Sequence, residues 1–163
     1  MSGRGEVAAR DSVDAITDAL LTASRLLVAL SARSIAQVDE SITIPQFRTL
    51  VILSTRGPSK IATLAADLNV QPSTATRMVD RLVTAGLIDR QPNPRSRREL
   101  IVELTARGRE IVAAVTARRR QAIAAVVEHM PAADRSGLVR ALTAFSTAGG
   151  EPDAGFDSEG YQL

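Results

Sequence analysis

The 163 residues of this chain suffice for one ordinary domain with extensions. Hydrophobic residues make up 45% of the chain and aromatic residues only 2%, a mixture that favours helices. The absence of cysteine excludes disulfides, thiolate metal sites and thiol-based redox sensing, and a single histidine offers little to a transition metal. No apolar run approaches the roughly 18 residues of a membrane span, and the start of the chain lacks the apolar core of a signal peptide. We therefore expect a cytoplasmic protein with no membrane segment, no metal and no cofactor.

Positive charge is concentrated in the middle of the chain. The formal net charge is only +2, but residues 71–120 hold eleven arginines against five acidic residues, a local net charge of +6. Residues 149–163 hold four acidic residues and no basic one. A local excess of arginine attracts phosphate even when the total charge is near zero, so this distribution suggests a nucleic-acid partner.

Long helices are predicted near both ends of the chain. Ser12 is a suitable N-cap, and the apolar residues that follow it to about Val38 recur at the spacing of one helical face. Thr105 can cap a second long helix, which Pro131 breaks. A last helix carries an apolar stripe of its own, made by Leu138, Leu142 and Phe145.

A helix, a tight turn and a second helix are predicted before Gly86. The first of these helices follows Gly57-Pro58 and has an i, i+3, i+4, i+7 stripe of Ile61, Leu64, Ala65 and Leu68. Asn69 then stands where the chain must turn, with a positive φ. Pro72 suits the first turn of the next helix, and Gly86 suits its left-handed end.

The hydrophobic period changes from helical to extended after Gly86. Leu87–Gln91 and Leu100–Leu104 are short, aliphatic segments that flank the basic stretch 92–98, which predicts a hairpin with a basic tip. The predicted fold class is therefore mainly α with a small β-hairpin wing, a winged helix-turn-helix lobe beside a helical dimerisation lobe.

The exposed face of the second helix carries the chemistry of DNA recognition. An α-helix fits the major groove, where small hydroxyl side chains approach closely and an arginine such as Arg77 can bind guanine O6 and N7 or hold a phosphate. Arginines on a narrow hairpin can enter an adjacent minor groove. The predicted DNA-binding residues are Ser73, Thr74, Thr76, Arg77 and Arg81 on the helix and Arg95, Arg97 and Arg98 on the hairpin.

The predicted elements divide the chain into four parts. They are a flexible N-terminus (1–11), a helical dimerisation region (12–42 and 105–148), a winged helix-turn-helix DNA-binding lobe (43–104) and a disordered acidic tail (149–163).

The stretch Leu64–Gly108 resembles the DNA-binding lobe of the MarR (multiple antibiotic resistance regulator) family. The similarity is densest in TRMVDRL of the second helix, in the AGLI turn and in RRELIVELTARG at the end of the hairpin. Thr43–Leu53 (TIPQFRTLVIL) is similar to that family's second helix, and the order of helices matches from about Ser12 to Ala148.

This resemblance implies a transcriptional regulator rather than an enzyme. It implies a homodimer, joined by the first helix and the last two, that binds a pseudo-palindromic operator in double-stranded DNA. It also implies a repressor that leaves its DNA when a small aromatic or anionic effector binds. The resemblance places the effector pocket between the two lobes, and we do not assign the residues of that pocket. The family's minor-groove arginine falls on Arg98, with Arg97 and Arg95 beside it, and its helix contacts fall on the five helix residues named above.

Three positions depart from the family pattern. Asn69 stands where the family often has glycine, and Gln71 stands where serine usually caps the recognition helix. The family's wing aspartate, two residues before its arginine, is Ser96 here. We therefore expect a poorly capped recognition helix and, because the carboxylate that would orient Arg98 is missing, a wing that is mobile in the free protein.

Two other function classes compete with this interpretation. An enzyme would need a catalytic set, but the sequence has no phosphate-cradling glycine loop and no nucleophile that His129 would serve, so we expect no catalytic residue. A winged helix that binds protein would need an apolar or acidic recognition face, whereas this one is hydroxyl-rich and basic. The terminal stripes would also fit a monomer core, but the length of the outer helices and the need for paired recognition helices favour a dimer.

Overall fold

The computed structural model describes residues 12–151, without the side chain of Arg97. Its elements are α2 (Val13–Ala36), α3 (Ile44–Arg56), β1 (Ser59–Lys60), α4 (Ile61–Leu68), α5 (Pro72–Thr84), β2 (Ile88–Asn93), β3 (Ser96–Leu104), α6 (Ala106–Glu128), α7 (Ala132–Arg135) and α8 (Leu138–Ala148). The predicted fold class is confirmed. The predicted flexible N-terminus and all of the predicted tail beyond residue 151 lie outside the described residues.

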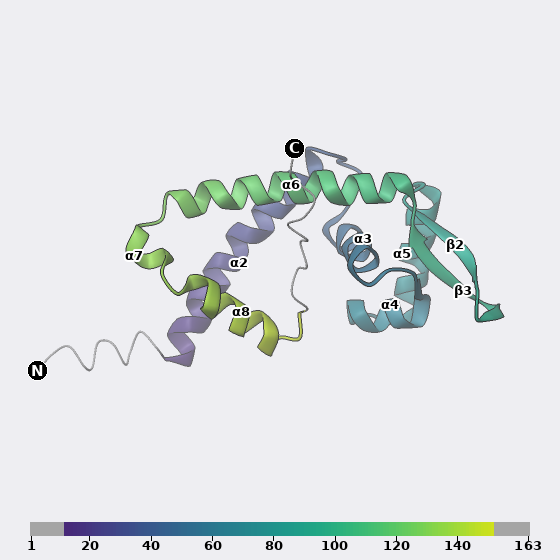
Figure 1. Cartoon of the computed structure of the whole chain (residues 1–163), viewed down its shortest axis with the longest axis horizontal. Helices are drawn as coiled ribbons and strands as arrows, with labels where there is room; N and C mark the ends of the chain where they lie inside the picture. The colour runs from purple at the N-terminus through teal and green to yellow at the C-terminus, as the bar shows by residue number, and fades with distance from the viewer. Residues whose placement is uncertain (1–11, 152–163) are drawn as a thin grey trace, which may run out of the picture.

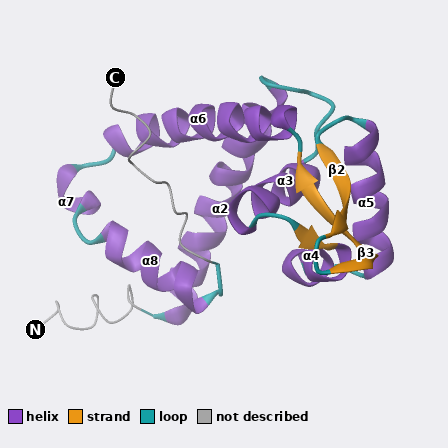
Figure 2. Ribbon diagram, turned by 45° about the vertical axis from the view of Figure 1, so that its right-hand side comes forward, coloured by secondary structure: helices purple, strands orange, loops and turns teal. Residues whose placement is uncertain are grey.

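The long helix α6 joins two groups of elements (Figures 1 and 2). The helices α3, α4 and α5 and the β2–β3 hairpin lie at its N-terminal end, and α7 and α8 lie at its other end. Helix α2 packs against α6. The hairpin projects outward beyond α5, so it forms one extremity of the molecule.

Local hydrogen bonds explain where the helices begin. The predicted caps are confirmed, because Ser12 Oγ accepts a bond from the Ala15 N–H at 3.2 Å and Thr105 Oγ1 accepts one from the Gly108 N–H at 3.0 Å. At the start of α3 the structure adds a reciprocal capping box between Thr43 and Gln46 that we did not predict. Its signal, a threonine followed three residues later by a glutamine, was present in the sequence.

The turn between α4 and α5 has the predicted geometry. Asn69 adopts φ 53° and ψ 47°, the left-handed region that an asparagine tolerates better than most residues. Gly86, just after α5, has φ 73° and so ends the recognition helix as predicted. Gln71 makes no side-chain capping bond to α5, which confirms the expected weak cap.

The hairpin is longer than predicted. The stretch 92–98 was expected to be a loop, but β2 continues to Asn93 and β3 begins at Ser96, so Pro94 and Arg95 alone form the turn. Proline at position 92 is accommodated because, within residues 12–151, β2 is an edge strand that pairs only with β3 in the sheet order β1-β3-β2. The two-residue strand β1 was missed, since a segment of that length has no periodicity to detect.

The core lies in the lobe that contains the recognition helix. Fully buried aliphatic side chains come from α3, α4, α5, α6 and the sheet, including Leu50, Leu64, Val79, Val115 and Ile88. Ala75, Val79 and Leu82 bury one face of α5. Because one face of α5 is fully used for packing, its opposite face is turned to solvent.

The helix α2 is more apolar than the sequence analysis allowed. An 18-residue window within Val13–Ala36 has a mean hydropathy of 1.4, and 6% of it is buried, so α2 is long and apolar enough to cross a membrane by length and composition. The expectation that no such run exists was wrong, because few charged residues interrupt the aliphatic ones. A single such helix is weak support for a membrane segment, since helices of soluble proteins pass the same test.

We predict that Gly108→Ala destabilises the protein. A Cβ on Gly108 would lie 2.2 Å from the Leu87 carbonyl oxygen and 3.3 Å from Leu104 Cδ2, so either α6 or the start of β2 would have to move. We expect a loss of about 1–3 kcal/mol in the free energy of unfolding, measured by chemical denaturation. Gly149→Ala is the control, because its nearest neighbour would be 3.5 Å away. Equal stability of the two variants would contradict the packing described here.

Candidate nucleic-acid interface

The recognition helix α5 presents its predicted DNA-binding residues at the surface. Four of the five side chains are exposed and that of Thr74 is half-buried, because they lie opposite the face that packs on the core. The Thr76 hydroxyl donates to the Pro72 carbonyl at 3.0 Å, which leaves its oxygen free to accept a bond from outside. The exposed set on the helix is Ser73, Thr76, Arg77 and Arg81.

The hairpin carries two further predicted residues to the extremity of the molecule. Arg95 lies in the turn, where its N–H donates to Asn93 Oδ1 at 3.0 Å, and its side chain is exposed. Arg98 is exposed on β3. Arg97 lies between Ser96 and Arg98 on the same strand, but its side chain is outside the described part of the structure. Two basic side chains thus project from the wing, on the same lobe as α5.

An ion pair that we did not predict joins the helix to the wing. Arg90 Nη2 on β2 contacts Asp80 Oδ1 on α5, with side chains that are 32% and 54% exposed. A partly exposed pair contributes little energy, but it connects the two elements that would contact DNA and neutralises the carboxylate on the outward face of α5. Sequence reasoning missed it because pairing between a helix and a strand depends on their packing.

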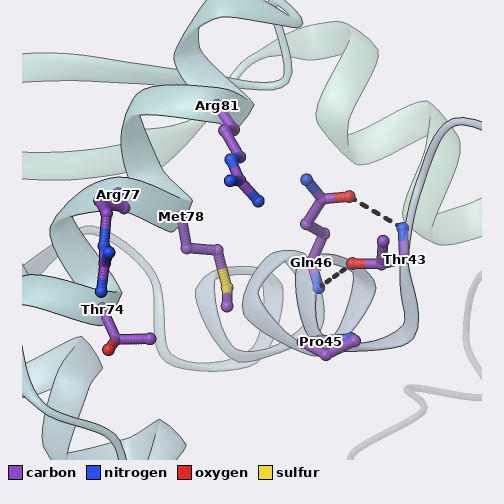
Figure 3. A pocket seen from close by; sticks show the side chains of 7 residues that line it. All are labelled: Thr43, Pro45, Gln46, Thr74, Arg77, Met78 and Arg81. Carbon is purple, nitrogen blue, oxygen red and sulfur yellow. Dashed lines mark hydrogen bonds between the residues drawn. The ribbon is translucent and has the colours of Figure 1, made fainter.

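A pocket of about 270 Å³ opens between the start of α3 and the recognition helix (Figure 3). Met78 and Arg81 extend from α5 toward α3, and Gln46 reaches up from α3 while bonding Thr43. The buried hydroxyl of Thr49 lies 2.7 Å from Met78 Sδ, which ties the helix to α3 behind the pocket. The lining residues are Thr43, Pro45, Gln46, Thr74, Arg77, Met78 and Arg81.

The profile of the MarR family matches residues 42–100, the part of the chain that contains α3, α4, α5, β2 and the start of β3. The HTH-type transcriptional repressor NicR of Pseudomonas putida is 40% identical over 70 residues, which are 43% of this chain and 44% of NicR. The chain therefore aligns with less than half the length of this curated relative, and the aligned part is of the size of the DNA-binding lobe.

Solved structures match over more of the chain. RV1404 from Mycobacterium tuberculosis is 71% identical, with a TM-score of 0.82 over 88% of this chain and 98% of that chain. Wild-type apo MarR from Escherichia coli is 25% identical, with a TM-score of 0.68 over 79% of this chain and 95% of that chain. The exposed basic and hydroxyl face of α5, the projecting wing and these matches agree, and the chain belongs to the MarR family of DNA-binding transcriptional regulators.

Proposed function

We propose that this chain is a cytoplasmic repressor that binds a pseudo-palindromic operator in double-stranded DNA as a homodimer. The observation that carries the proposal is that one lobe exposes both the hydroxyl and arginine face of α5 and the arginines of the wing. NicR, the 40% identical relative, is a transcriptional repressor, and this supports the direction of regulation. The proposed DNA contacts are Ser73, Thr74, Thr76, Arg77, Arg81, Arg95, Arg97 and Arg98.

The recognition helix and the wing would divide the work of DNA binding. Helix α5 has the width to enter the major groove, where Arg77 would meet base edges and Arg81, one turn later, a phosphate. The start of α5 lacks a side-chain cap, and an uncapped helix N-terminus attracts the negative charge of a phosphate. The hairpin is narrow enough to place Arg98 in the neighbouring minor groove.

We place the dimer interface on the helices at the far end from the wing. Among residues 12–151, α8 buries none of its side chains, and Leu142 and Phe145 are 47% and 56% exposed. The long apolar helix α2 is also largely exposed. Apolar surface of this extent needs cover, and a second copy would bury it while pairing two recognition helices for two half-sites. Residues 12–42 and 105–148 would then form the dimerisation region around the lobe 43–104.

DNA affinity should fall steeply as salt concentration rises. A dimer with arginines on two recognition helices and two wings should neutralise on the order of 6 to 10 phosphates, which predicts a log-log slope of roughly −5 to −9. Titration of labelled duplex DNA at several salt concentrations measures this slope. A slope near zero would remove the electrostatic basis of the proposal.

Alanine substitutions of Arg77 and Arg98 should impair DNA binding in different ways. Arg77→Ala should cost roughly 1–3 kcal/mol on the specific site and relax the preference at the base pairs that α5 reads. Arg98→Ala should weaken binding on most sequences, with sequence dependence confined to the flanks that the wing meets. Binding to operators with single changes at the centre or in the flanks separates the two patterns. Arg48→Ala is the charge control, because it removes an exposed arginine of α3 that pairs with Glu151 and belongs neither to the proposed DNA contacts nor to the proposed dimerisation region. Indistinguishable patterns would refute this assignment of helix and wing.

A charge placed in the α8 stripe should break the dimer. Leu142→Asp and Phe145→Asp would each bury a carboxylate without a partner, at a cost of several kcal/mol, so we expect loss of both the dimer and operator binding. Thr143→Asp adds the same charge to an exposed position of α8 beside the stripe and is the matched control. Mass measurement in solution at micromolar concentration gives the oligomeric state. A monomeric variant that keeps full operator affinity would contradict the proposed dimer.

We also propose that a small anionic organic effector releases the DNA by binding between α3 and α5, inside the DNA-binding lobe and not between the two lobes as the family resemblance implied. At about 270 Å³ the pocket suits a single-ring compound, and Arg77 and Arg81 line it. An aromatic carboxylate there would occupy the arginines that DNA needs. We expect such acids to displace labelled operator, their uncharged amides to fail, and Arg81→Ala to weaken direct binding of the acid about tenfold or more. Equal displacement by acid and amide would contradict this proposal.

A further inference from the structure

A carboxylate lies at the base of the wing, although the family's wing aspartate is replaced by Ser96. Glu99 of β3 forms an ion pair with Lys60, with 2.8 Å between Oε2 and Nζ, and accepts a hydrogen bond from Asn93 Nδ2 at 3.2 Å. Asn93 in turn accepts, through Oδ1, the bond from the Arg95 N–H. Three consecutive interactions thus run from Lys60, the N-cap residue of α4, to the wing turn.

This chain of contacts spans a part of the molecule that the sheet does not hold together. Among the described residues, β1 pairs with β3 only through Ser59 and Lys60, and the last of these pairs is opposite Ile101. From Leu100 to the turn, the hairpin has no β1 residue beside it. An open groove of about 520 Å³ separates this part of the hairpin from the start of α4. Glu99 therefore provides a side-chain link between the wing and the helix-turn-helix across that groove.

The charges in this link have a consequence for DNA binding. Glu99 is ionised at neutral pH, as an ordinary glutamate is, and the hydrogen bond from Lys60 lowers its pKa further. An ionised Glu99 repels phosphate and a free Lys60 attracts it. If these residues acted through charge alone, removing Glu99 would strengthen DNA binding and removing Lys60 would weaken it.

We propose that Glu99 is a positioning residue for the wing. Bonded to Lys60 and Asn93 at once, it fixes the distance of the wing turn from α4, so that the wing arginines meet the minor groove while α5 occupies the major groove. This inference rests on the proposed function, because it requires a wing that contacts DNA. It replaces the expectation of a mobile wing with that of one restrained by a carboxylate from a different position.

A double-mutant cycle on the full chain tests the inference. We expect Glu99→Ala and Lys60→Ala each to weaken operator binding about two- to fivefold, and the double variant to bind no more weakly than either, because each change breaks the same link. Asp89→Ala, which removes an exposed carboxylate from β2 of the same sheet, should bind at least as tightly as the unchanged protein. Tighter binding by Glu99→Ala, weaker binding by Lys60→Ala and additive effects in the double variant would overturn the inference.

A second measurement separates positioning from general loss of stability. Circular dichroism first confirms that the variants fold. Glu99→Ala should then speed amide hydrogen exchange at residues 93–98. In hydroxyl-radical footprinting of the bound operator, it should remove protection of the flanks while the centre stays protected. Lys60→Arg, which keeps both the ion pair with Glu99 and the bond from Asn93, should retain flank protection. Unchanged exchange and unchanged flanks in Glu99→Ala would refute the inference. Arg98→Ala separates failure of the proposed function from failure of the role of Glu99. If Arg98→Ala leaves DNA affinity unchanged, the proposed function fails. If it weakens DNA binding but the effects of Glu99→Ala and Lys60→Ala are additive, only the role of Glu99 fails.

Discussion

Thr105 forms the junction on which the arrangement of the DNA-binding lobe depends. Its hydroxyl donates to the Gly86 carbonyl at 2.7 Å and accepts the Gly108 N–H, while its own N–H donates to the Leu87 carbonyl at 3.1 Å. One residue therefore joins the end of the recognition helix, the start of β2 and the first turn of α6. Because these hydrogen bonds are directional and lie beside the core, the recognition helix, the wing and the long helix are held in one geometry.

The proposed function follows from what this rigid lobe leaves exposed. Burial of Ala75, Val79 and Leu82 directs the hydroxyl and arginine face of α5 outward, and the hairpin extends from the same lobe. Two acidic residues near this surface are paired, Asp80 with Arg90 and Glu99 with Lys60. Pairing keeps the local field positive where phosphate would bind, although the chain as a whole carries a formal charge of only +2.

The parts of this structure that could be predicted from sequence are those set by neighbouring residues. The caps at Ser12 and Thr105, the left-handed Asn69 and the outward face of α5 all depend on interactions within a few positions of the chain. The strand β1, the full length of the hairpin and the Arg90–Asp80 pair depend on segments that meet only after folding. For the same reason Ser96 indicated a missing carboxylate, while Glu99, whose partner Lys60 is 39 positions away, gave no local signal.

Selection of bound sequences from a random duplex library tests the central claim most directly. A selected palindrome requires both a helix that reads base pairs and a second copy of that helix in the same dimer. If two α5 helices in a dimer read successive major grooves, the selected DNA will contain two inverted half-sites about 10 base pairs apart, centre to centre, and two chains will bind each duplex. Enrichment of a single asymmetric site bound by one chain, or no enrichment above the starting library, would contradict the account.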